Sequence, residues 1–99
     1  MADSSLLSAS ITVPQHVVYR SFPAETVVLN LETGLYHGLN PTAGNMLDVL
    51  VQVGNVRAAA SSLARSFGQS TATIEQDLCE LCEALHERGL VEISGAGAL

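Results

Sequence analysis

The spacing of hydrophobic residues changes near position 40. Before it, β-branched and other apolar residues form two short runs, residues 17–19 and 25–31, with Pro and Gly at their borders. Such runs are typical of strands. Residues 32–34 form a short connection that contains Gly34, so the second run and residues 35–39 are predicted to pair as a hairpin. The first part of the chain therefore predicts three antiparallel strands.

After position 40, apolar residues recur at the spacing of helices. Asn40 followed by Pro41 is a typical helix start, with Asn40 as the N-cap and Pro41 in the first turn. Asn55 provides a second cap of the same kind. The apolar stripe of the last helix consists of Ile74, Leu78, Leu81 and Leu85. The predicted helices cover residues 41–53, 56–67 and a third segment that begins near Thr71 or Thr73, and the glycines that end them are Gly54, Gly68 and Gly89.

The order of these elements predicts the fold class. Three strands precede three helices that are joined by short glycine turns, and residues 90–93 predict a last short strand. We expect an α+β fold that is winged helix-turn-helix-like, with a three-stranded antiparallel sheet followed by three helices. One domain would span residues 11–93. Residues 1–10 are small and polar, residues 94–99 are mostly small, and we expect both segments to be poorly ordered tails.

Composition and charge narrow the classes of partner. The 99 residues suffice for one domain, and 47% hydrophobic residues can fill a modest core. The chain has 4 Lys plus Arg against 10 Asp plus Glu, which gives a formal charge of −6. Such a chain repels phosphate, and it has no Trp and few aromatic residues on which bases could stack. We therefore expect no nucleic-acid partner.

Targeting signals are missing from the N-terminal segment. Residues 1–10 contain no Lys or Arg and only one apolar pair, Leu6-Leu7, so they do not resemble a secretion signal. No run approaches 18 uninterrupted apolar residues, which a membrane-spanning helix would need. We expect a cytoplasmic protein that does not associate with membranes.

The strongest candidate for metal chemistry is Cys79-x-x-Cys82 with His86 one turn further on the same predicted helix. A metal normally requires a fourth ligand, for which Glu75 and Glu83 are the only nearby residues. A redox dithiol would need a cysteine at a helix N-terminus, and both cysteines lie in the middle of the helix. We expect small, partly buried side chains and predict no metal site and no cofactor.

Catalytic motifs are also missing. The three histidines, His16, His37 and His86, belong to different predicted elements. The sequence contains no glycine-rich phosphate loop, no Gly-x-Ser-x-Gly turn and no paired-carboxylate motif. We therefore predict a protein that is not an enzyme and has no catalytic residues.

Two blocks of the sequence resemble a known family. Residues 28–44 read VLNLETGLYHGLNPTAG, which combines a hydrophobic strand, an acidic-x-Gly turn, an aromatic strand and a Leu-Asn helix start. Residues 74–91 contain an Asp-Leu helix that ends in Arg88-Gly89-Leu90. With this order and spacing, residues 11–93 resemble the PqqD-like family. Its members recognise the leader of ribosomally made peptides that are later modified.

The resemblance implies a binding mode. In this family the leader adds as a strand to the edge of the sheet and lies against the third helix, so that its backbone pairs with unpaired N–H and C=O groups. The resemblance places the receiving edge at Leu35, Tyr36, His37, Gly38 and Leu39. On the third helix we expect the groove wall to be Asp77, Glu80, Leu81 and Ala84, although helical periodicity leaves open which flank of the stripe faces the edge strand. Each of these residues also has a purely structural interpretation, as a core or solvated side chain.

The expected function is that of a non-catalytic adaptor that captures the leader and presents the precursor to an enzyme. In a lasso-type pathway the partner would be a cysteine-protease-like leader peptidase, and the second choice is a radical-SAM modifying enzyme. The alternative from a different class is a winged-helix DNA-binding regulator. The third predicted helix argues against it, because it would be the recognition helix and carries five acidic residues but only one arginine, Arg88, whereas DNA-reading helices are usually basic. A third interpretation is a structural subunit that only dimerises through its edge strand.

Overall fold

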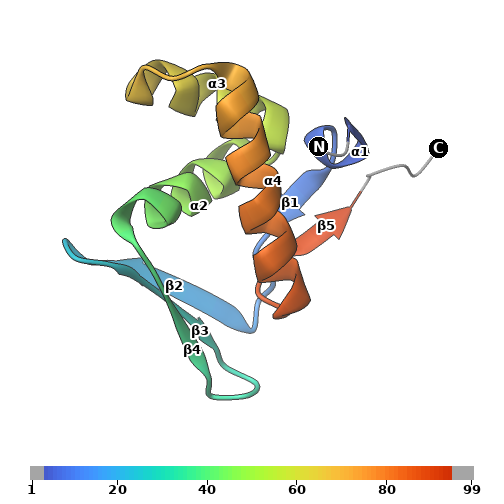
Figure 1. Ribbon diagram of the computed structural model, residues 1–99. Helices are drawn as coiled ribbons and strands as arrows, with labels where there is room; N and C mark the ends of the chain where they lie inside the picture. Colours follow the sequence, from blue (N-terminus) through green and yellow to red (C-terminus); the bar gives the residue numbers. More distant parts are fainter. Residues whose placement is uncertain (1–3, 95–99) are drawn as a thin grey trace.

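The computed structural model describes residues 4–94. Over this part of the chain, two small antiparallel sheets are packed with four helices (Figure 1). The predicted α+β class, with its three-stranded antiparallel sheet and three main helices, is confirmed. The elements are, in order, α1 (Ser4–Leu7), β1 (Ser10–Thr12), β2 (Val17–Ser21), β3 (Thr26–Asn30), β4 (Tyr36–Leu39), α2 (Pro41–Val53), α3 (Val56–Phe67), α4 (Thr71–Glu87) and β5 (Glu92–Ser94).

The larger sheet has the strand order β2-β3-β4, and both pairs are antiparallel. The hairpin between β3 and β4 is shorter than the sequence suggested. The Asn30 side chain accepts hydrogen bonds from the N–H groups of Glu32 (2.9 Å) and Thr33 (3.3 Å), which turns the chain directly after β3. As a result Leu31 and Leu35 lie outside the strands, and Leu35, which we had placed in the edge strand, is 63% exposed in the turn.

The two faces of this sheet have different surroundings. Side chains alternate along β3, so that Thr26, Val28 and Asn30 are buried while Val27 and Leu29 on the opposite face are only partly buried. We call the buried face the inner face, because the core lies against it, and the opposite one the outer face. Figure 1 shows the helices gathered on one side of the β2-β3-β4 sheet.

The boundaries of the main helices follow local capping signals. Asn40 Oδ1 accepts a hydrogen bond from Ala43 N–H (2.8 Å), and Pro41 occupies the first turn of α2. Asn55 caps α3 in the same way. Gly54 ends α2 with a φ of +86°, a left-handed conformation that favours glycine. Helix α4 starts at Thr71, the earlier of the two predicted positions, because Ser70 is its N-cap.

The N-terminal segment differs from its expected disorder. Within residues 4–10, the α1 residue Leu6 is 6% exposed and Ala9 is fully buried. Strand β1 pairs with β5 through Ile11 and Ile93, and Ile11 N–H donates to the Gly54 carbonyl (2.8 Å). This second sheet joins the two ends of the domain. A last strand was predicted over residues 90–93 and is present slightly later, at Glu92–Ser94, whereas no strand was predicted at Ser10–Thr12. Residues 1–3 and 95–99, the remainder of the expected tails, lie outside the described residues.

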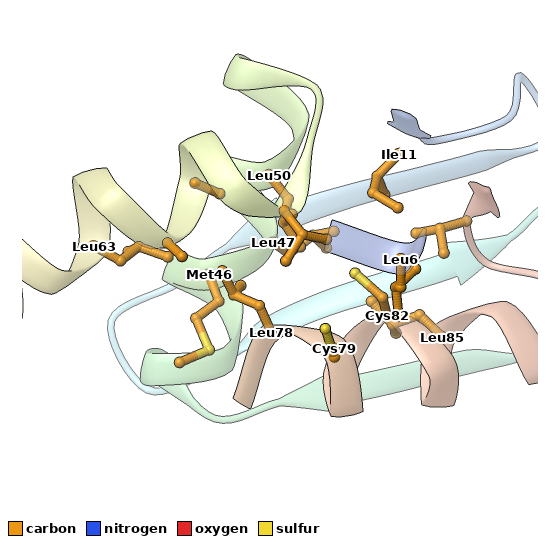
Figure 2. Close-up of a cluster of buried hydrophobic side chains, with 14 of the residues drawn as sticks. Leu6, Ile11, Met46, Leu47, Leu50, Leu63, Leu78, Cys79, Cys82 and Leu85 are labelled. Atoms are coloured by element: carbon orange, nitrogen blue, oxygen red, sulfur yellow. The ribbon is translucent and has the colours of Figure 1, made fainter. Parts of the chain in front are cut away.

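The core lies between the helices, α1 and the inner face of the larger sheet. Figure 2 shows side chains from α2, α3 and α4 converging with Leu6 of α1 and Ile11 of β1. The buried positions of α4 differ from the expected stripe, because both cysteines join the core and Leu81 is only partly buried. The fully buried large side chains are Ile11, Leu47, Leu50, Leu63, Ile74, Leu78, Leu85, Leu90, Val28, Val56 and Cys82.

Helix α2 lies close against β3 at Gly44. A Cβ atom at this position would overlap the hydroxyl oxygen of Thr26 and lie 2.7 Å from its Cβ. Thr26 is 3% exposed and exchanges a hydrogen bond with the Ser21 hydroxyl (3.0 Å). Because Thr26 is held on the inner face of β3, it has little freedom to move aside. Glycine at position 44 therefore sets the distance between the helix layer and the sheet.

We predict that Gly44→Ala destabilises the protein by about 1–3 kcal/mol, although alanine is the better helix former, because the added methyl group overpacks the contact with Thr26. Urea unfolding followed by circular dichroism measures this change. The matched control is Asn45→Ala at the exposed neighbouring position of the same helix, which should change stability by less than about 0.5 kcal/mol. Equal stability of the two variants would show that the helix and sheet are free to separate at this point.

Candidate functional site

The backbone of β4 forms hydrogen bonds with β3 on one side only. Asn30 N–H donates to the Leu35 carbonyl (2.9 Å), so in an antiparallel ladder the bonded pairs continue at every second residue. In the observed register these pairs are Val28 with His37 and Thr26 with Leu39. The intervening residues of β4, Tyr36 and Gly38, therefore direct their N–H and C=O groups away from β3. Among residues 4–94, no other strand pairs with β4 on that side.

The side chains of β4 divide between the two faces of the sheet. Leu39 is 9% exposed and belongs to the core, as predicted, while His37 is partly buried on the same inner face. Tyr36 lies on the outer face, opposite Leu29, and is 71% exposed. Such exposure of an aromatic ring shows that Tyr36 contributes little to the core. The open edge thus combines a free backbone with an exposed aromatic side chain.

The outer face of the sheet carries further apolar side chains on β3 and on β2 at the opposite edge, which the sequence analysis did not single out. Val18 and Phe22 are about half exposed, and a hollow of about 440 Å³ is lined by residues of β2 and β3. Its lining also includes the partly buried Val27 and Leu29 and the side chain of Arg20. The sequence held no alternating signal here, because Val27, Val28 and Leu29 form a continuous apolar run, and the alternation of burial along β3 is visible only in the structure.

A hydrogen-bond chain ties the opposite strand, β2, to α2. The Tyr19 hydroxyl donates to Asp48 Oδ1 (3.2 Å), and Gln52 Nε2 donates to Asp48 Oδ2 (3.1 Å). Burial, followed by the Asp48 carboxylate, raises the pKa of Tyr19, so the phenol keeps the proton that it donates. This link fixes α2 across the inner face of the sheet, while the outer edge of β2 stays open among the described residues.

The structure distinguishes the two flanks of α4. The flank with Cys79 and Cys82 faces the core, where the two side chains are 4% and 0% exposed. They are thus more deeply buried than expected. On the opposite flank Asp77, Glu80 and Ala84 are exposed, and Leu81 at the border is partly buried. The four residues expected to form a groove wall therefore share the accessible flank of the helix.

The geometry around the cysteines offers no metal centre. Among residues 4–94, no group of three or more His, Cys, Asp or Glu side chains is arranged to hold a metal ion. His86 Nδ1 lies 3.4 Å from the carbonyl oxygen of Val91, the residue directly before β5. Burial, followed by Cys79 and Glu83, raises the pKa of Cys82 to about 12. A thiol that keeps its proton is a poor nucleophile and a poor metal ligand.

We predict that the free energy of unfolding falls as the pH rises from about 9 towards 12. The Cys82 thiol ionises near pH 9 in the unfolded chain and only near 12 in the folded one, so the folded state holds more protons between these values. Urea unfolding at pH 8, 9.5 and 10.5 measures the slope, and Cys82→Ala should flatten it. The native thiol should also resist Ellman's reagent at pH 8 until urea is added. Rapid reaction of the native protein would contradict the burial of Cys82.

Within residues 4–94, none of the helices is both long and apolar enough to cross a membrane. The secondary structure and strand order make the described part of the chain an α+β domain, with helices on one face of a small sheet and an open strand edge. This arrangement is the winged helix-turn-helix-like one expected from the order of the elements.

The comparisons with known proteins identify the family. The model of the family described as coenzyme PQQ synthesis protein D (PqqD) matches residues 25–91, which include β3, β4 and all three main helices. The chain therefore belongs to the PqqD family. Among curated proteins, none is significantly similar to it.

Two solved structures have the same fold. One is described as TbiB1 in complex with the TbiA(beta) leader peptide; it is 25% identical, has a TM-score of 0.74, and the match covers 82% of this chain and 94% of that one. The other is described as lasso peptide synthetase B1 complexed with the leader peptide; it is 20% identical, has a TM-score of 0.75, and the match covers 84% and 98% of the two chains. The predicted resemblance to PqqD-like proteins is thus confirmed.

Proposed function

We propose that this protein binds the leader segment of a ribosomally made precursor peptide by adding it as a strand to the open edge of β4. The observation that carries the proposal is the direction of the Tyr36 and Gly38 backbone groups, which are not used by β3. Unpaired edge groups bind an extended chain without reading its sequence. Family membership and the two leader-bound structural neighbours support a leader as the guest.

Selectivity for one leader would come from alternate side chains of the guest strand. Those that point to the inner side of the sheet would reach the exposed flank of α4, formed by Asp77, Glu80, Leu81 and Ala84. Leu81 and Ala84 offer apolar contact, whereas the two carboxylates attract a Lys, Arg or amide group. Exposed charges of this kind alter the association rate and the choice of partner more than the total affinity.

The protein itself would catalyse no step of the pathway. It would act in the cytoplasm, where it holds the leader and presents the rest of the precursor to a separate enzyme. The fold shared with lasso peptide synthetase B1 favours a lasso-type pathway and a cysteine-protease-like leader peptidase as that enzyme. A radical-SAM modifying enzyme is the second choice, on the basis of the PqqD family model.

The negative charge of α4 makes DNA binding a weaker proposal than leader binding. The accessible side of α4 carries Asp77, Glu80, Glu83 and Glu87, all of them exposed. In a major groove these carboxylates would face phosphate groups. The basic residues available to compensate are Arg57 and Arg65 in α3 and Arg88 directly after α4. A dimer formed through the β4 edge would compete directly with a guest strand, so light scattering with and without leader distinguishes it.

We predict that Tyr36→Pro abolishes leader binding in a folded protein, because it removes an N–H group that faces the open edge. Tyr36→Ala is the matched control, since it removes the ring but keeps the N–H group, and it should bind more tightly than the proline variant. Leaders of short reading frames beside this protein's gene are labelled with fluorescein and titrated by anisotropy. Unchanged affinity of the folded Tyr36→Pro variant would rule out strand addition at β4.

Two further proline variants locate the effect. The N–H of His37 is directed towards β3, so His37→Pro should disrupt the β3-β4 pairing and unfold the sheet, whereas Tyr36→Pro blocks only the open edge. Ser21→Pro blocks an outward N–H of β2, the other open edge, and should leave leader affinity unchanged. Loss of binding in Ser21→Pro alone would place the guest on β2 instead of β4.

We predict that Asp77→Lys with Glu80→Lys weakens leader binding by about fivefold at low salt and flattens its dependence on salt, because the attraction to a basic or amide group is lost. Titrations between 20 and 500 mM NaCl measure both effects. The charge control is Glu92→Lys in the small sheet, at an exposed position on β5. If the double variant and the control behave alike, α4 does not contact the guest.

A further inference from the structure

The carboxylate of Glu25 lies over Gly38 on the outer face of the sheet. A Cβ atom at position 38 would be 2.6 Å from Glu25 Oε1, so the carboxylate occupies the space that a side chain would fill. Glu25 precedes β3, whereas Gly38 is in β4, and only the antiparallel register brings them together. An acidic group thus stands at the open edge, although β4 itself contains no acidic residue.

Within residues 4–94, no basic side chain forms an ion pair with this carboxylate. In the described part of the chain, the one contact of a basic with an acidic side chain within 4 Å joins His16 Nε2 to Glu32 Oε1 (3.9 Å), and it is an ion pair only when the imidazole is protonated. The nearest basic residue on the outer face is Arg20, which is paired with Val27, while Val27 is paired in turn with Gly38. Arg20 is thus a diagonal neighbour of Glu25 across the β2-β3 pair, but it forms no ion pair with the carboxylate, which lies over Gly38 on the far side of β3. Glu25 is exposed and available to a group that approaches from the open edge.

A guest strand would bring a side chain to this carboxylate. Gly38 directs its N–H and C=O groups towards the open edge, so one guest residue would pair with it directly. Side chains of directly paired residues point to the same face, with Cβ atoms about 4.5–5.5 Å apart. Because the Glu25 carboxylate takes the place of the Gly38 Cβ, the guest side chain on the outer face would lie next to a negative charge.

We propose that Glu25 selects a lysine or arginine at the leader position that pairs with Gly38, and that Gly38 is the positioning residue which admits the carboxylate. This inference rests on the proposed function. It is distinct from the role of Asp77 and Glu80, since the helices lie at the inner face, and the guest residues that point there are offset by one position. A leader that satisfies both sites would carry adjacent residues with polar or basic character.

The test uses a phage library of random twelve-residue peptides as the probe. Selection on the wild-type protein should enrich peptides with Lys or Arg at one position. Selection on Glu25→Gln should lose that enrichment while the remaining pattern persists. Glu92→Gln removes one charge at a distant exposed position and is the matched control, which should select the same peptides as the wild type.

Affinities of one selected peptide then quantify the contact. Replacing its basic residue by Gln should weaken binding to the wild type about two- to fivefold, the range of exposed ion pairs, and should leave binding to Glu25→Gln unchanged. Gly38→Ala keeps the carboxylate but displaces it, and should lose the preference in the same way. The preference should also disappear in 500 mM NaCl.

The outcomes separate the two proposals. If peptides are selected whose binding is lost in Tyr36→Pro but which show no basic preference dependent on Glu25, strand addition stands and the role of Glu25 is wrong. If Gly38→Ala keeps the full preference, the positioning role of Gly38 is wrong. If no peptide that needs the β4 edge is selected, the proposed function itself fails.

Discussion

The central constraint in this domain is that β3 is the one strand of the larger sheet with a partner on both sides. Its backbone groups alternate between β2 and β4, and its side chains alternate between the core and the outer face. The contact of Thr26 with Gly44 then fixes α2 against the inner face. The helices cover the inner face of the sheet, and the backbone groups of β3 are all used by its two neighbours. The outward backbone groups of β4 are therefore left without a partner among the described residues.

Most of the fold was predictable because its signals are local. Asn40 with Pro41, Asn55, and the glycines after each helix determined the boundaries of α2 and α3 to the residue. A last strand near residues 90–93 was predictable, but β1 and its pairing with β5 were not, because the two strands lie at opposite ends of the chain and each is only three residues long. Its stability comes from tertiary burial of Ile11 rather than from a local pattern.

The candidate site was predictable only as far as the position of the edge strand. The sequence could not show which backbone groups of β4 face outwards, since that depends on the bonded pair Asn30 with Leu35. Nor could it orient α4, because a free cysteine is a small hydrophobic residue that a core accommodates as readily as a leucine, and here Cys82 is buried more completely than Leu81. Register and burial are tertiary properties, and both decide which residues a guest can reach.

An open strand edge is also a site for unwanted pairing with a second copy, and this edge has features that oppose it. Strand β4 has only four residues, and Gly38 offers no side chain for a stable cross-strand pair. If two such edges paired antiparallel about this strand, the carboxylates of both Glu25 residues would come close together and repel each other. A basic guest meets the opposite sign. The charge that we assign to selection would therefore also favour a leader over self-association, which explains how one edge can stay open in a protein with a formal charge of −6.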